Sequence, residues 1–132
     1  MKKLLAGSLV AASLALFAQS RPPAHMEVFR ALAEALANRD ADAFLDPFDR
    51  QMPDYDKLRD EIRDVVGTAE EIGSTIDVIT DNGDEQKRML ELDWLLKIDT
   101  DTPRRQIVRC QIEMQGKKWK ITALEPVEFF KK

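Results

Sequence analysis

The segment from Lys87 to Glu125 alternates apolar and polar residues with a period of two. Its first part places apolar residues at the even positions from Leu90 to Ile98, and charged residues fill most of the odd ones. Its second part repeats the alternation from Val108 to Met114. A period of two over this length is typical of half-buried strands, which are apolar on one face and polar on the other. The sequence therefore predicts three long antiparallel strands that share one apolar face.

A two-residue turn at Gly116-Lys117 joins the last two strands, with glycine where a type II′ hairpin needs it. Glu113 and Lys120 then face each other on the polar side, where opposite charges stabilise the pairing. The same register predicts three apolar pairs: Met114 with Trp119, Ile112 with Ile121, and Cys110 with Ala123. We expect Cys110, the single cysteine, to be a small buried hydrophobe, and we expect Trp94 and Trp119 to lie in the core.

A fourth strand precedes these three, because residues 72–80 also alternate and Asn82-Gly83 is typical of a turn. A three-residue loop from Asn82 to Asp84 keeps the apolar faces together and predicts a bulge at Gly83. The loop between the next two strands falls at residues 100–103. These two loops predict the following pairs: Ile76 with Leu90, Ile72 with Trp94, Asp93 with Arg109, and Leu95 with Ile107.

Three helices are predicted before the strands. Apolar residues recur at spacings of three and four over residues 24–37, then over a short segment that Asp40 caps and Pro47 interrupts. A third helix begins after Pro53, with Asp54 as its cap, and ends near Gly67. The order of elements specifies an α+β domain, with three N-terminal helices packed on one face of a curved four-stranded antiparallel sheet.

Residues 1–20 have the features of a secretory signal peptide. Lys2 and Lys3 precede an apolar run, and small residues at positions 18 and 20 form a cleavage site. We expect cleavage after Ser20, export to the periplasm or the extracellular space, and a single domain at residues 21–132. The alternative is an uncleaved anchor helix, although the apolar run is short for a membrane span. After cleavage, 18 basic residues remain against 24 acidic ones. This balance argues against nucleic acid or an anionic membrane as the main partner.

Two strings, ALANRDADAFLDPF at residues 35–48 and GKKWKITAL at residues 116–124, resemble the nuclear transport factor 2-like superfamily. The superfamily includes SnoaL-like proteins, ketosteroid isomerases and many non-catalytic modules. The resemblance implies a cystatin-like cone, in which a curved sheet wraps the first helix and often leaves a pocket at the open end. It also implies that a homodimer can form through the outer face of the sheet, where Leu95, Ile79, Ile107 and Leu124 are expected. The alternative is that these four residues are scattered surface hydrophobes.

Catalytic members of this superfamily carry ionisable groups on the inward face of the sheet. Through its centre, the predicted inward face of this chain has no Asp, Glu, His, Tyr, Arg or Lys. Any acid or base must therefore come from the helices, where Asp46, Asp49 and Tyr55 are weak candidates. His25, the only histidine, is expected to be solvated near the N-terminus. No spacing indicates a metal or cofactor site. A bound apolar ligand would contact the following pocket-lining residues: Phe29, Phe44, Phe48, Leu92, Trp94 and Trp119.

Three functions remain open from the sequence. The first is a non-enzymatic exported module that binds a small apolar ligand or a protein partner. The second is a small isomerase or dehydratase that acts on a hydrophobic substrate. The third is a structural or oligomerising domain. An empty apolar cavity favours the first, polar groups that converge in a cavity favour the second, and a filled cone favours the third.

Overall fold

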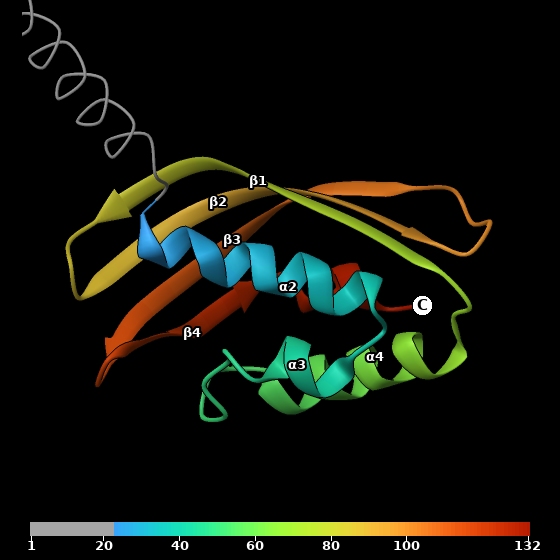
Figure 1. Cartoon of the computed structure of the whole chain (residues 1–132), viewed down its shortest axis with the longest axis horizontal. Coiled ribbons are helices and arrows are strands. Elements are labelled where there is room, and N and C mark those ends of the chain that lie inside the picture. Colours follow the sequence, from blue (N-terminus) through green and yellow to red (C-terminus); the bar gives the residue numbers. More distant parts are fainter. Residues whose placement is uncertain (1–22) are drawn as a thin grey trace, which may run out of the picture.

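The computed structural model describes residues 23–132, so the predicted signal peptide lies outside the described residues. Four long strands form one antiparallel sheet in sequence order, and the sheet curves around the helices (Figure 1). The alternation of apolar and polar residues explains why these segments become strands with one buried face. The strands are β1 (Ile72–Gly83), β2 (Lys87–Ile98), β3 (Arg104–Gln115) and β4 (Lys118–Glu125).

The helices all lie on the concave side of the sheet, as predicted (Figure 1). Asp40 caps α3 through a hydrogen bond that its carboxylate accepts from the Ala43 backbone N–H, whereas Asp54 precedes α4 without a side-chain cap. Among residues 23–132, no helix is both long and apolar enough to cross a membrane. The helices are η1 (Ala24–Met26), α2 (Glu27–Ala37), α3 (Ala41–Leu45), α4 (Tyr55–Thr68) and η2 (Val127–Phe130).

The predicted β3–β4 hairpin is confirmed near its turn and wrong farther from it. Glu113 pairs with Lys120, and the two apolar pairs next to the turn form as expected. Beyond them, Thr122 is an extra residue in β4 and its hydroxyl accepts a 2.9 Å hydrogen bond from the Gln111 amide. This bulge moves the register by one residue, so Cys110 pairs with Leu124 instead of Ala123. Leu124, expected on the outer face, is therefore buried.

The predicted registers of the other two strand pairs are wrong, although the assigned faces are right. Ile76 lies opposite Trp94, four residues from the prediction, because Asp84 and not Gly83 organises the turn. The Asp84 carboxylate accepts hydrogen bonds from the backbone N–H groups of Gln86 and Lys87, at 2.8 and 2.9 Å. The bulge lies at Ile79. In the β2–β3 pair, Asp93 lies opposite Ile107, two residues from the prediction, because the last β2 residue that pairs with β3 is Leu96.

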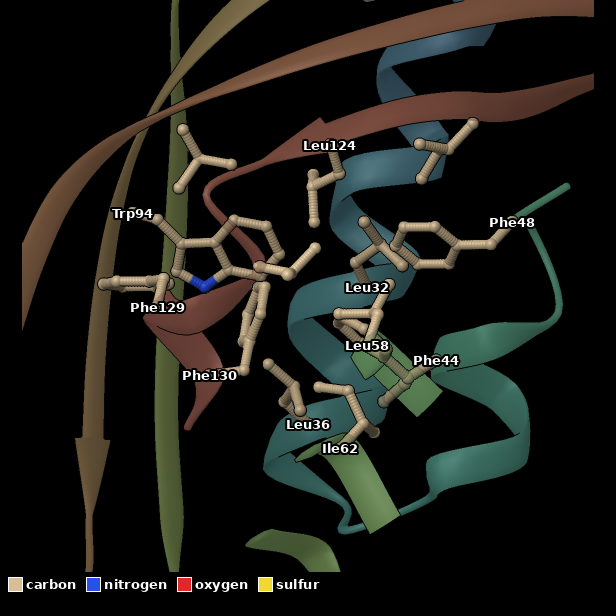
Figure 2. Close-up of a cluster of buried hydrophobic side chains, with 14 of the residues drawn as sticks. Leu32, Leu36, Phe44, Phe48, Leu58, Ile62, Trp94, Leu124, Phe129 and Phe130 are labelled. Carbon is tan, nitrogen blue, oxygen red and sulfur yellow. The ribbon is translucent and has the colours of Figure 1, made fainter. Parts of the chain in front are cut away.

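The C-terminal helix η2 enters the space between the sheet and the helices, which the sequence did not predict. Phe129 and Phe130 pack against Trp94, with ring centroids 6.1 and 5.0 Å away (Figure 2). Phe44 approaches Phe130 from α3 at 5.7 Å. Trp94 is completely buried and its indole N–H donates a 2.9 Å hydrogen bond to the Ser74 hydroxyl. The centre of the fold is therefore a cluster of aromatic side chains.

His25 is buried, which corrects the expectation of a solvated terminal histidine. Its Nε2 lies 2.6 Å from the Asp81 carboxylate, which also accepts a 2.6 Å hydrogen bond from Arg88. The bulge at Ile79 turns Asp81 to the inward side, so this contact could not be read from the alternation. The His25 ring also packs edge-on against Trp119, which is half-buried and not fully in the core. These contacts connect η1, which contains His25, to the C-terminal end of β1.

The Asp81→Asn variant is expected to lower the free energy of unfolding at neutral pH by about 1.5–3 kcal/mol, because two charge-assisted hydrogen bonds are weakened. Burial raises the pKa of Asp81, but the hydrogen bonds from His25 and Arg88 outweigh it, so the net shift is downward. This stabilisation is present above about pH 4 and is lost as the pH falls through the lowered pKa. Urea unfolding at several pH values measures it, with exposed Asp101→Asn as the control. An unchanged pH profile would contradict the role of Asp81.

Candidate functional site

Most of the residues predicted to line a ligand pocket are packed in the core of the cone, although Phe29 also borders a pocket of about 560 Å³ between α2 and β1. Five of the six residues predicted to line that pocket are almost completely buried, at 3% exposure or less: Phe29, Phe44, Phe48, Leu92 and Trp94. Their neighbours include Phe129 and Phe130 from the chain end (Figure 2). The apolar run at residues 127–130 was the sequence signal that η2 is buried. A terminal segment of four residues, however, has no periodicity that predicts where it packs.

The three candidate catalytic residues do come together, at one end of the cone. Asp46, Asp49 and Tyr55 all line a pocket of about 430 Å³. We call it the mouth pocket. It lies between α3, the segment from residue 46 to residue 50, α4 and the β3–β4 hairpin, whose Gln115 and Lys120 contribute to the lining. This pocket is outside the packed core.

Hydrogen bonds between the segment around Phe48 and strand β4 fix one wall of the mouth pocket. The Ile121 backbone N–H donates to the Pro47 carbonyl, and the Asp49 N–H donates to the Ile121 carbonyl, both at 2.8 Å. Phe48 is thereby placed as a short parallel partner of Ile121, with its ring in the core. Lys120 adds a 2.8 Å hydrogen bond from its ammonium group to the Asp46 carbonyl. The wall is therefore preorganised by contacts distant in sequence.

Asp49 is held as an ionised carboxylate. Its pKa is lowered first by a hydrogen bond from the Gln51 backbone N–H and then by one from the Gln115 amide, at 2.8 and 2.9 Å. Both donors favour the charged form of the carboxyl group. Asp49 is therefore poorly suited to donate a proton, and Tyr55 makes no hydrogen bond to it within residues 23–132. Asp46 is exposed.

A carboxyl group with a raised pKa occurs at Glu61, which does not line the mouth pocket. Desolvation is the main cause, and the Glu128 carboxylate adds to it, whereas Lys57 opposes the shift. One Glu61 oxygen is buried without a hydrogen-bond partner among the described residues. Within residues 23–132, no three His, Cys, Asp or Glu residues are grouped so as to hold a metal ion. Cys110 is buried, and burial raises the pKa of its thiol.

Sequence reasoning missed the arginines of the mouth pocket. Arg63 lies two helical turns after Tyr55 on α4, so the spacing of eight residues was a usable signal. Arg50 lies in the segment after Phe48 and had no such signal. Both line the pocket, and neither makes an ion pair or hydrogen bond with another residue in the range 23–132. The pocket is thus lined by both acidic and basic side chains.

The outer face of the sheet carries exposed aliphatic side chains among charged ones. Leu95 on β2 and Ile107 on β3 are 41% and 45% exposed, and they are diagonal neighbours across the two strands. The outward acidic groups are concentrated on β1 and β2, and outward arginines lie on β3. These groups are Asp77, Glu91 and Asp93 on the acidic side, and Arg105 and Arg109 on the basic side.

Comparison with solved structures identifies the fold. A protein from Shewanella oneidensis, described as NTF-2-like and of unknown function, superposes with a TM-score of 0.63 at 13% identity, covering 75% of this chain and 92% of its own. An association domain of calcium/calmodulin-dependent protein kinase type II from Thiobacillus denitrificans, so described, gives 0.63 at 14% identity, covering 79% and 95%. The chain therefore has the nuclear transport factor 2-like fold, which confirms the resemblance seen in the sequence.

A third structure, from Bdellovibrio bacteriovorus, gives a TM-score of 0.65 at 12% identity, covering 73% of this chain. The matched region spans only 36% of that larger chain. No protein-family model matches the sequence, and no curated protein matches it either. At sequence identities of 12–14%, the similarity shows a shared fold only. The function therefore has to be inferred from the surfaces of this chain.

Proposed function

We propose that this chain is an exported, non-enzymatic association module that forms a homodimer through the outer face of its sheet. The packed interior carries the proposal. Trp94, Phe44 and Phe130 occupy the volume in which a member of this fold would hold a substrate or an apolar ligand. The large hydrophobic side chains that are most exposed, Ile79, Met89, Leu95 and Ile107, lie on the outer face of the sheet, and a partner protein is the occupant that fits them.

The charges of the outer face favour a second copy as the partner. A two-fold axis parallel to the strands, placed between β2 and β3, brings β2 of each copy against β3 of the other. Glu91 then lies opposite Arg109 of the second copy, and Leu95 lies opposite Arg105 of the second copy, two residues along the strand from Ile107. Within residues 23–132 of one chain, Arg109 has no ion-pair partner, so the dimer would supply one. Acidic and basic strands thus complement each other across the interface.

The outer face is also large enough for a stable contact. The three strands of twelve residues are about 40 Å long, and with the eight-residue β4 beside them the sheet covers a width of about 19 Å. The resulting face is close to the roughly 800 Å² that each partner buries in an interface of standard size. The fold likeness to a domain described as an association domain agrees with this use of the surface.

The Ile107→Lys variant is expected to shift the dimer to a monomer, because it places a charge at the centre of the apolar contact. The loss in affinity should be about tenfold or more, which corresponds to roughly 1.4 kcal/mol. Sedimentation velocity over a concentration series measures the change. Ala31→Lys is the control, since Ala31 is exposed on α2 and lies away from the outer face of the sheet. A wild-type chain that stays monomeric at high concentration would contradict the proposal.

For export, the expected result is a mature chain that begins at Arg21. The basic start, the short apolar run and the small residues before position 21 motivate this expectation. N-terminal sequencing of protein recovered from the cell envelope or the medium measures it. Recovery of the chain with Met1 intact and embedded in the membrane would show that residues 1–20 serve as an anchor instead.

A further inference from the structure

We propose that the mouth pocket binds a small zwitterion, a molecule with a carboxylate at one end and an ammonium group at the other, such as a dipeptide. This function is separate from self-association, because the pocket lies at the end of the cone and not on the outer face of the sheet. The proposal is carried by charged side chains of both signs that line one pocket without pairing with each other.

Arg50 and Arg63 form the cationic side of the site. Most arginines in residues 23–132 have a partner; Arg39 and Arg104 donate to backbone carbonyls, and Arg88 and Arg105 bind carboxylates. Arg50 and Arg63 are exceptions, and both line the mouth pocket. A guanidinium group presents its N–H donors in a planar fork that matches a carboxylate. Two such groups in one pocket can hold the carboxylate of a ligand.

Asp42 and Asp46, at the two ends of α3, form the anionic side. The positive groups come from other elements, Arg63 from α4 and Arg50 from the segment before it. Neither aspartate carboxylate lies within 4.0 Å of an arginine nitrogen of the pocket, so both charges are available to a ligand. An ammonium group placed at Asp42 and Asp46 would complete the arrangement, and a simple anion would be repelled by them.

The other polar groups of the pocket are already engaged and act as a rigid frame. Asp49 accepts from Gln51 and Gln115, and Lys120 donates to the Asp46 carbonyl. These bonds anchor the backbone of the wall to strand β4, so binding has to order only the exposed side chains of the charged residues. A volume of about 430 Å³ lies within the usual range for small-molecule sites. The free Tyr55 side chain, half-buried at the rim, adds a surface against which the ligand can pack.

In the test, alanyl-alanine is titrated into the full mature chain, and binding is monitored by ¹H–¹⁵N NMR. Saturable shifts are expected at the amides of Gln51 and Tyr55 and at the arginine Nε–H groups, with a dissociation constant in the range of about 1 mM or tighter. Acetylated alanyl-alanine keeps only the carboxylate, and alanyl-alanine amide keeps only the ammonium group. Both are expected to bind at least tenfold more weakly than the zwitterion, because each leaves one side of the site unpaired.

Substitutions in the mouth pocket test whether alanyl-alanine binds there. Arg63→Gln is expected to weaken binding of alanyl-alanine by tenfold or more, and Asp46→Asn should weaken it in the same direction. Arg59→Gln is the matched control, because Arg59 is on the same helix but already pairs with Asp56 and Asp60. Equal binding by Arg63→Gln and wild type, or no saturable shift with the zwitterion, would overturn the proposal. Repeating the titration in Ile107→Lys separates this result from any failure of the dimer.

Discussion

Replacing Trp94 with alanine is expected to lower the free energy of unfolding by about 3–5 kcal/mol, since a completely buried aromatic ring leaves a cavity in a packed core. The neighbouring rings of Phe129 and Phe130 belong to the same cluster and lose contacts (Figure 2). The Ser74 hydroxyl also loses its hydrogen-bond donor. Urea unfolding followed by circular dichroism measures the change in the denaturant midpoint.

The control for Trp94→Ala is Lys97→Ala, three residues later on the same strand with its side chain exposed. It should change stability by less than about 0.5 kcal/mol. Trp119→Ala should be intermediate between the two, because Trp119 is half-buried. A denaturant midpoint that stays the same in Trp94→Ala would contradict the assignment of Trp94 to the centre of the core.

Removal of residues 127–132 is expected to abolish the cooperative folded state. The truncation deletes three buried apolar side chains, and each would cost about 2–5 kcal/mol if it were removed alone. Their combined loss is comparable with the whole stability of a small domain, about 5–15 kcal/mol. It also removes the carbonyls of Phe129 and Lys131, to which Arg104 donates. Near-ultraviolet circular dichroism and thermal unfolding measure the loss of fixed packing.

Glu128→Gln is the control for this truncation. Glu128 lies in the same four-residue helix, but its carboxylate is in an exposed ion pair with Lys57, which contributes little to stability. Its replacement should leave the unfolding transition cooperative and its midpoint nearly unchanged. If the truncated chain unfolds like the wild type, helix η2 is not part of the core and the cone is open.

The sequence allowed the fold class and the faces of the strands to be predicted, but not all strand registers. The alternation of apolar and polar residues determines which face of a strand is buried, and a shift of two or four residues leaves that face unchanged. Thus Trp94 is buried as predicted although its partner is Ile76 and not Ile72. The register depends on local turn chemistry at Asp84 and on the bulges at Ile79 and Thr122, which the alternation does not specify.

The candidate site was predicted only in part, for a related reason. Asp46, Asp49 and Tyr55 were predicted as candidate acid or base residues, and all three line the mouth pocket. Their partners are distant in sequence. The hydrogen bond from Lys120 to Asp46, for example, spans 74 positions. Contacts of this length are made by the packing of helices against the sheet, and no spacing within a helix or a strand encodes them.

The pairing of Phe48 with Ile121 limits the addition of further strands at the β4 edge of the sheet. The free edge of β4 is already occupied at Ile121 by backbone groups of Pro47 and Asp49, and proline has no N–H to extend the ladder. The opposite edge, β1, is interrupted by the bulge at Ile79 and by the inward charge of Asp81. Such devices hinder the addition of further strands from neighbouring molecules. Both borders of the sheet thus discourage open-ended polymerisation, whereas the proposed contact through the broad outer face would close after two copies.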